Sequence, residues 1–274
     1  MPEVDHRPQG MPIWGELDTP DVEQAKAFYG RLFGWCSYAM TLDTLGEYEI
    51  FTREVPLGPG IAGVQPLSER ASPPSWICYF RTTDLAASIA AINASGGEEL
   101  VGMRQVGLLG QHGLFTDPEG ARFGLWEPFE HQHSALIDEP STMCWMELAC
   151  HDPRQARRFY ELVFGWRTVD NDDEGFIDAK IGTRSVASMV EIGERWPPRW
   201  RSQWVPYFEV ADCDSSTTLA ADLGAHVHIP PANIASGRFA LITDPAGARL
   251  ALLAPDRRYR RLWQRDHTKP HPTV

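Results

Sequence analysis

The chain repeats its own sequence once, at an offset of nearly half its length. Trp14-Gly-Glu16-Leu17 recurs as Trp145-Met-Glu147-Leu148, and the aromatic run at residues 28–35 recurs at residues 159–166, both with an offset of 131. Short solenoid repeats have periods of about 20 to 50 residues. A period this long therefore predicts two duplicated domains, each large enough to form its own core and its own cavity.

Two later segments repeat in the same order. Trp76-Ile-Cys-Tyr79-Phe80 matches Trp204-Val-Pro-Tyr207-Phe208, and the turn Asp117-Pro-Glu-Gly matches Asp244-Pro-Ala-Gly. The length of 274 residues agrees with two domains. We expect a first domain at residues 11–130, a linker at 131–141, a second domain at 142–255 and a basic C-terminal tail at 256–274.

Composition favours a soluble, cytoplasmic protein. The formal charge of −12 argues against a nucleic-acid or anionic-membrane surface, because phosphate binding needs clustered Lys and Arg. The five cysteines form no C-x-x-C pair, which favours reduced thiols. No signal peptide or membrane-spanning run is recognisable. We expect a monomer or homodimer.

Hydrophobic periodicity and turn residues predict one order of elements, repeated four times. In the first half we expect a strand at 12–18, a helix at 22–32, and strands at 35–42, 47–52 and 61–65. A strand at 76–82, a helix at 84–94 and strands at 100–105, 113–116 and 122–126 follow, and the second half has the same plan. The fold class is thus α+β, with four βαβββ units.

This order, with Phe28-Tyr29-x-x-Leu32-Phe33-Gly34-Trp35, its copy at residues 159–166 and the two Asp-Pro-x-Gly turns, resembles the vicinal oxygen chelate superfamily. The superfamily includes glyoxalase I, extradiol dioxygenases and bleomycin-binding proteins. Within it, the chain is similar to two-domain actinobacterial proteins of the mycobacterial thirty-kilodalton antigen type and to proteins of antibiotic gene clusters. The resemblance implies paired units in tandem glyoxalase-like domains, each a U-shaped mixed sheet with its ligand inside.

The resemblance also locates the metal-ligand positions of metal-using relatives. These positions hold Trp14 and Trp145 on the first strands, and Gly124 and Ala251 after the Asp-Pro-x-Gly turns. A divalent site needs about three imidazole or carboxylate ligands. We therefore expect no metal and no other cofactor.

Carboxylates remain beside the two tryptophans. Glu16 and Glu147 lie two residues beyond Trp14 and Trp145, hence on the same strand face. Indole rings would desolvate a carboxyl group and raise its pKa, as a general acid or base requires. The alternative is a structural role, with bonds to backbone or to an arginine such as Arg122 or Arg249.

Several other polar groups are candidates. His112 has Phe239 as its counterpart in the repeat, and this asymmetry would suit a catalytic residue or simply a structural one. His226 and His228 alternate on one strand, without an evident third ligand. The remaining candidates for ligand binding are Trp14, Trp145, Trp76, Trp204, Tyr48, Gln111 and Arg238. The alternatives are core packing for the tryptophans and a turn cap for Arg238.

Three functions stay open at this stage. The first is a metal-independent protein that binds a hydrophobic, aromatic small molecule, such as a drug or secondary metabolite, for resistance, carriage or biosynthesis. The second is a metal-independent isomerase, cyclase or lyase in which Glu16 or Glu147 moves a proton and His112 assists. The third is a metal-dependent lyase or dioxygenase with relocated ligands, drawn from Glu16, Glu147, His112, His226 and His228.

Overall fold

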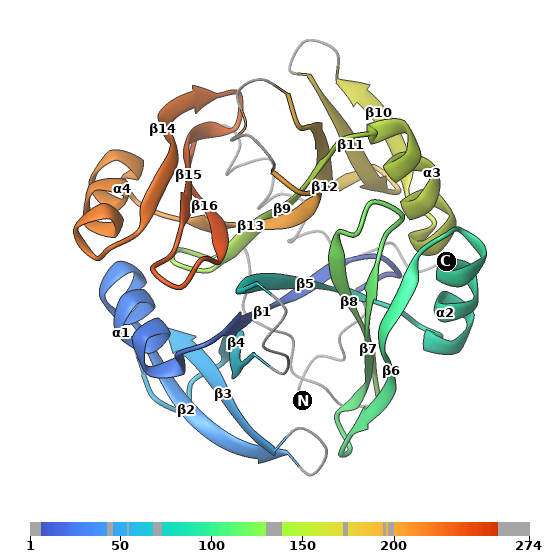
Figure 1. The fold of residues 1–274 in the computed structure, drawn as a ribbon, viewed down its shortest axis with the longest axis horizontal. Coiled ribbons are helices and arrows are strands. Elements are labelled where there is room, and N and C mark those ends of the chain that lie inside the picture. The colour runs from blue at the N-terminus through green and yellow to red at the C-terminus, as the bar shows by residue number, and fades with distance from the viewer. Residues whose placement is uncertain are drawn as a thin grey trace, which may run out of the picture.

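The protein forms two eight-stranded mixed sheets with two helices each (Figure 1). The computed structural model describes residues 7–42, 46–53, 55–67, 73–129, 139–171, 175–193, 196 and 200–256. The predicted tail beyond residue 256 and linker residues 131–138 lie outside this part of the chain. The α+β class and the four βαβββ units are confirmed. The domain boundaries at residues 130, 142 and 255 stay predictions.

The elements of the first half are β1 (Pro12–Thr19), α1 (Val22–Phe33), β2 (Trp35–Leu42), β3 (Gly46–Arg53), β4 (Gly60–Pro66), β5 (Ser75–Arg81), α2 (Leu85–Ala94), β6 (Glu98–Val106), β7 (Gly110–Thr116) and β8 (Arg122–Pro128). Those of the second half are β9 (Met143–Cys150), α3 (Pro153–Phe164), β10 (Arg167–Asn171), β11 (Phe176–Ile181), β12 (Arg184–Glu191), β13 (Gln203–Glu209), α4 (Cys213–Asp222), β14 (His226–Ile234), β15 (Gly237–Thr243) and β16 (Arg249–Pro255).

Both halves have the same strand order. The first sheet runs β2-β3-β4-β1-β5-β8-β7-β6, and the second runs β10-β11-β12-β9-β13-β16-β15-β14. The pairs β1–β4, β5–β8, β12–β9 and β13–β16 are parallel, and the central pairs β1–β5 and β13–β9 are antiparallel. Each sheet curls into a U, and the two concave faces open in opposite directions (Figure 1).

Local sequence sets the ends of the first helix of each half. The Asp21 side chain accepts a hydrogen bond from the backbone N–H of Gln24, and Asp152 caps α3 in the same way. Both helices end at a glycine in the left-handed conformation, Gly34 at φ 75° and Gly165 at φ 71°. These repeated signals explain why the helix bounds were predictable to within a residue or two.

The convex faces of the two sheets pack against each other through one aromatic core. Phe33 at the end of α1 lies 5.4 Å from Phe208 of β13 between ring centroids. The reciprocal contact joins Phe164 of α3 to Phe80 of β5 at 4.8 Å. The first helix of each half therefore packs on the central strand of the other half, and the core is shared.

Buried hydrogen bonds cross the same interface twice. The Tyr29 hydroxyl donates to Asp244 Oδ2 at 2.8 Å and accepts from Trp76 Nε1 at 3.0 Å. In the symmetric copy, Tyr160 donates to Asp117 Oδ2 at 3.1 Å and accepts from Trp204. Each Asp-Pro-x-Gly turn is thus tied to the first helix of the opposite half.

Candidate functional site

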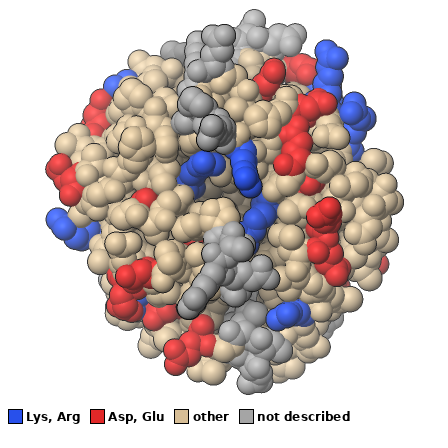
Figure 2. All heavy atoms as spheres, in the orientation of Figure 1, with Lys and Arg blue, Asp and Glu red and all other residues tan. Residues whose placement is uncertain are grey.

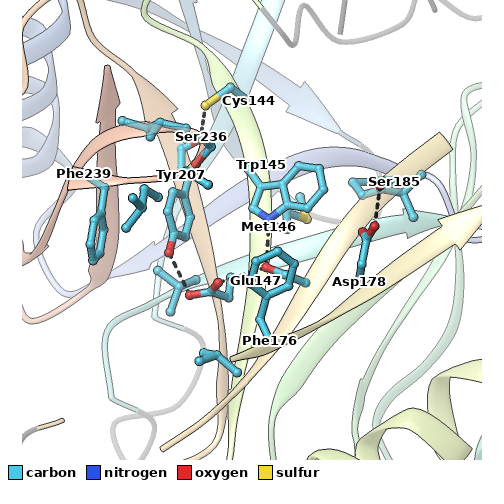
Figure 3. A pocket seen from close by; sticks show the side chains of 18 of the residues that line it. Cys144, Trp145, Met146, Glu147, Phe176, Asp178, Ser185, Tyr207, Ser236 and Phe239 are labelled. Atoms are coloured by element: carbon cyan, nitrogen blue, oxygen red, sulfur yellow. Dashed lines mark hydrogen bonds between the residues drawn. The ribbon is translucent and has the colours of Figure 1, made fainter. Parts of the chain in front are cut away.

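The concave face of the second sheet encloses a cavity of about 610 Å³. Its wall is rich in aromatic side chains from four strands and one loop: Trp145, Phe176, Trp196, Tyr207 and Phe239. Figure 3 shows Phe176 from β11 and Tyr207 from β13 on the two sides of Glu147. A volume of roughly 300 to 1,000 Å³ suits a drug-sized ligand.

Glu147 is the carboxyl group at the centre of this wall. Its Oε1 accepts from the Tyr207 hydroxyl at 2.7 Å, and its Oε2 accepts from Ser188 Oγ at 2.9 Å. Trp145 Nε1 in turn donates to Ser188 Oγ at 2.9 Å. Burial raises the pKa of Glu147, and these two hydroxyl donors offset part of that rise.

The cavity has a second carboxyl group, on β11, that is already paired. Asp178 accepts from Ser185 Oγ and forms an ion pair with Lys180 Nζ, both at 2.7 Å. Glu147 receives only neutral donors in its described contacts. The two carboxyl groups therefore differ in charge environment: Asp178 has a cationic partner, although its Oδ1 has no hydrogen-bond partner in the described structure, whereas Glu147 has neutral donors on both oxygens.

In the first half, the equivalent carboxyl group is sealed. Glu16 is 6% exposed, and its oxygens accept from Tyr48 at 2.7 Å, Gln65 at 3.0 Å and Tyr79 at 3.1 Å. Trp14 Nε1 donates to the Tyr48 hydroxyl at 3.1 Å. Burial and the nearby Asp18 carboxylate raise the pKa of Glu16 to about 7. Tyr48, expected to bind a ligand, instead covers Glu16.

Two glycines make room for the tyrosines that seal Glu16. A Cβ atom at Gly63 would overlap the Tyr48 hydroxyl and lie 2.5 Å from Cζ of that ring. A Cβ atom at Gly124 would overlap the edge of the Tyr79 ring and lie 2.7 Å from its Cγ. In the second half, the registers put Ser188 and Ala251 at these two positions.

The arginines expected to pair with the glutamates have other partners. Arg122 forms its ion pair with Asp18, two residues beyond Glu16, at 3.0 Å. Arg249 stacks over the Trp200 ring, 3.7 Å from its centroid. The carboxyl groups of Glu16 and Glu147 are held by hydroxyl and amide donors instead, so the structural alternative takes a form without a direct arginine partner.

Known proteins resemble this chain in sequence, and solved structures resemble it in fold. A glyoxalase-like domain matches residues 145–253. CFP32 of Mycobacterium tuberculosis, a protein named as a glyoxylase, is 32% identical over 260 residues, which cover 93% of this chain and 98% of CFP32. The anthracycline biosynthesis protein DnrV of Streptomyces peucetius is 31% identical over 252 residues, 87% of this chain and 91% of DnrV.

The chain belongs to the vicinal oxygen chelate superfamily. Two solved structures of this superfamily have the same fold at low sequence identity. The 2,3-dioxygenase LapB from a Pseudomonas species has a TM-score of 0.60 at 15% identity, over 92% of this chain and 96% of LapB. The Mn(II)-bound glyoxalase from Novosphingobium aromaticivorans has a TM-score of 0.58 at 14% identity, over 97% and 96% of the two chains.

The metal that many vicinal oxygen chelate proteins use does not fit the residues at the expected ligand positions. Trp14, Tyr79 and Gly124 lie side by side on β1, β5 and β8, and the second half places Trp145, Tyr207 and Ala251 in the same row. Burial raises the pKa of both tyrosines well above the usual value, which disfavours phenolate ligands. Tyr79 also fills the space over Gly124.

The ligands proposed for a relocated metal are not brought together. Within the described residues, no group of three His, Cys, Asp or Glu side chains has a metal-binding arrangement. Glu16 and Glu147 lie on opposite concave faces. His226 and His228 have ring centroids 4.5 Å apart, and His228 Nε2 shares a hydrogen bond with Thr243 Oγ1 at 2.6 Å.

His112 lies on β7, on the wall of the first concave face. It is 7% exposed, its ring centroid is 6.3 Å from that of Tyr79, and its buried Nε2 has no hydrogen-bond partner in the described structure. Burial and the positive charge of Arg104 lower its pKa to about 4. His112 is thus a neutral imidazole, in the half opposite to the cavity.

Besides Trp14 and Tyr48 of the first half, four predicted ligand contacts lie away from the cavity. Trp76 and Trp204 are buried in the core between the sheets, because they alternate with the cavity-facing positions of β5 and β13. Gln111 donates to Glu127 Oε2 at 2.8 Å, and this oxygen also accepts from Leu85 N at the start of α2. Arg238 donates to Asp214 of α4 at 2.8 Å.

Sequence reasoning missed the hydrogen-bond partners of the two glutamates. Tyr79 and Tyr207 occupy equivalent positions in the repeat, three residues after Trp76 and Trp204, so the strand period places them on the opposite face. That signal was available. Ser188 and Phe176 were not identifiable, because the repeat is weakest between the two aromatic motifs of each half.

Charge on the molecular surface is unevenly placed. On the face shown in Figure 2, a few Lys and Arg side chains surround a central hollow, while acidic side chains are spread over the periphery. None of the helices in the described part of the chain is long and apolar enough to span a membrane.

Proposed function

We propose that the protein binds a hydrophobic, aromatic small molecule in the cavity of the second half, without a metal ion. The observation that carries the proposal is the aromatic wall around about 610 Å³ of space, with one carboxyl group, Glu147, whose described partners are all neutral. Pockets of this kind are mainly apolar, with a few polar groups that orient the ligand. The donor set at the superfamily's metal positions offers no imidazole or carboxylate.

The relatives support a secondary metabolite as the ligand class. DnrV and DauV are named as anthracycline biosynthesis proteins, and this chain covers 91% of each. Carriage, resistance or a step in the biosynthesis of a polycyclic aromatic compound are all compatible with such a cavity. We place the protein in the cytoplasm, as a monomer or homodimer.

The test is a titration of tryptophan fluorescence with planar aromatic metabolites and antibiotics, followed by recovery of each compound for mass spectrometry. We expect saturable quenching, because Trp145 and Trp196 line the cavity. Recovery of the compound unchanged supports a binding protein. A panel that leaves the fluorescence unaltered at millimolar concentration contradicts the proposal.

A metal-independent isomerase, cyclase or lyase is the second candidate, favoured by the raised pKa of Glu147 at the cavity wall. Glu147→Gln separates the two functions. A binding protein keeps most of its affinity in this variant, whereas an enzyme that uses Glu147 as acid or base loses about 10²-fold or more in turnover. Glu16→Gln is the matched control, because Glu16 is sealed behind Tyr48 and Tyr79.

A further inference from the structure

The two halves build the same hydrogen-bonded relay from different residues. In the first half, Trp14 Nε1 donates to the Tyr48 hydroxyl, which donates to Glu16 Oε2. In the second half, Trp145 Nε1 donates to Ser188 Oγ, which donates to Glu147 Oε2. One hydroxyl group bridges the indole and the carboxyl group in both cases.

The residue that supplies this hydroxyl differs in size between the halves: it is a tyrosine in the first half and a serine in the second. Tyr48 lies on β3 two residues before Ile50, which pairs with Gly63, so its ring reaches over the glycine. Phe176 lies on β11 two residues before Asp178, which pairs with Ser188. Since Ser188 has a side chain where Gly63 has none, the ring of Phe176 cannot occupy the equivalent place.

We propose that Tyr48 acts as an internal ligand that closes the first half, and that Ser188 keeps the matching volume of the second half open for one aromatic ring of an external ligand. Ser188 already satisfies Trp145 Nε1 and Glu147 Oε2, so the ring that enters there need not carry a hydroxyl group. The chain then binds one ligand. This inference rests on the proposed function and adds the residues that determine which half binds.

The first experiment would close the cavity of the second half by giving it the residues of the first half. The double variant Ser188→Gly/Phe176→Tyr provides both the phenol and the space for it, whereas each single variant provides one of them. With 1-aminoanthracene as the fluorescent probe, we expect one site per wild-type chain. The double variant is expected to bind the probe at least about tenfold more weakly than the two single variants predict when their changes in binding free energy are added. Additive losses overturn the proposal, as does a wild-type stoichiometry of two.

The second experiment would open the first half by the reverse exchange. Gly63→Ser/Tyr48→Phe supplies the relay hydroxyl from residue 63 and displaces the ring, so a second probe is expected to bind per chain. A crystal structure of Ser188→Gly/Phe176→Tyr gives a readout that needs no ligand. The new phenol should lie over residue 188, within hydrogen-bond distance of Glu147; a ring turned toward solvent overturns the inference. If the wild-type protein binds no probe, the proposed function fails while this structure still decides the inference.

Discussion

Replacing Glu16 with glutamine is expected to remove the contribution of this buried carboxyl group to the pH dependence of folding stability. Glu16 is buried, and its pKa rises from 4.5 to about 7, mainly because burial disfavours the charged form. The folded protein therefore binds one more proton than the unfolded chain between these pH values. The contribution of Glu16 to the free energy of unfolding is fully present below pH 4.5 and is lost as the pH rises through 7.

The size of the effect follows from the shift. A change of about 2.5 pKa units corresponds to about 3 kcal/mol, since one unit is worth 1.36 kcal/mol. Glutamine resembles the protonated acid, because it keeps one oxygen for the donors Gln65 and Tyr79 and places an N–H near Tyr48. The variant should gain about 3 kcal/mol relative to wild type between pH 4 and pH 8.5.

Urea denaturation at a series of pH values measures this difference directly. The contributions of titrating groups that do not interact with Glu16 cancel, because both proteins share them. The same substitution at the exposed Glu98 controls for the loss of one surface charge. A difference in unfolding free energy between Glu16→Gln and wild type that stays constant across this range would refute the reasoning.

Three further predictions concern the core, His112 and the metal. Tyr29→Phe should lower the unfolding free energy by about 1 to 3 kcal/mol, because Asp244 Oδ2 loses its donor, and Tyr160→Phe should add a similar, independent loss; urea titration of the single and double variants tests both values and their additivity. His112→Phe should stabilise the fold by about 1 kcal/mol at pH 7, because an unpartnered buried Nε2 is removed. The stability of His112→Phe relative to wild type should increase further as the pH falls from 6.5 to 4, because the lowered pKa of His112 destabilises the wild-type protein in this range. A loss of turnover in this variant would instead indicate that His112 takes part in catalysis. Elemental analysis should find less than roughly a tenth of an equivalent of divalent metal, and chelator should leave probe affinity unchanged, because a site needs about three suitable ligands.

Much of the fold was predictable from particular residues. Asp21 and Gly34 set the ends of α1 through local hydrogen bonds and a left-handed turn, and Asp152 and Gly165 repeat them. Such signals act within a few residues, so a sequence displays them directly. The order of helices and strands along the chain followed from the fourfold repeat of the βαβββ unit, and the resemblance supplied the curvature of the sheets.

The site was predictable only in part. Strand period placed Trp14 with Glu16 and Trp145 with Glu147, and the structure keeps both pairs on the concave faces. The strand period did not reveal that Tyr48 covers Glu16 on one face while Phe176 lines a cavity on the other. Trp76 and Trp204 were misplaced because repetition alone does not show which face of a strand lies on the concave side of the sheet.

The sequence by itself determined the duplication, the four βαβββ units and the loss of metal-ligating residue types, because these depend on residue identity and on spacing along the chain. Only the tertiary structure decided that the halves share one core and that the second concave face is open. The shared core depends on aromatic contacts between residues far apart in the sequence, such as Phe33 with Phe208. The difference between the concave faces involves Tyr48 and Phe176, each two residues before the strand partner of Gly63 or Ser188. A Cβ atom at residue 63 would overlap the Tyr48 ring, and in a close-packed interior one atom is enough to exclude a side chain from its place.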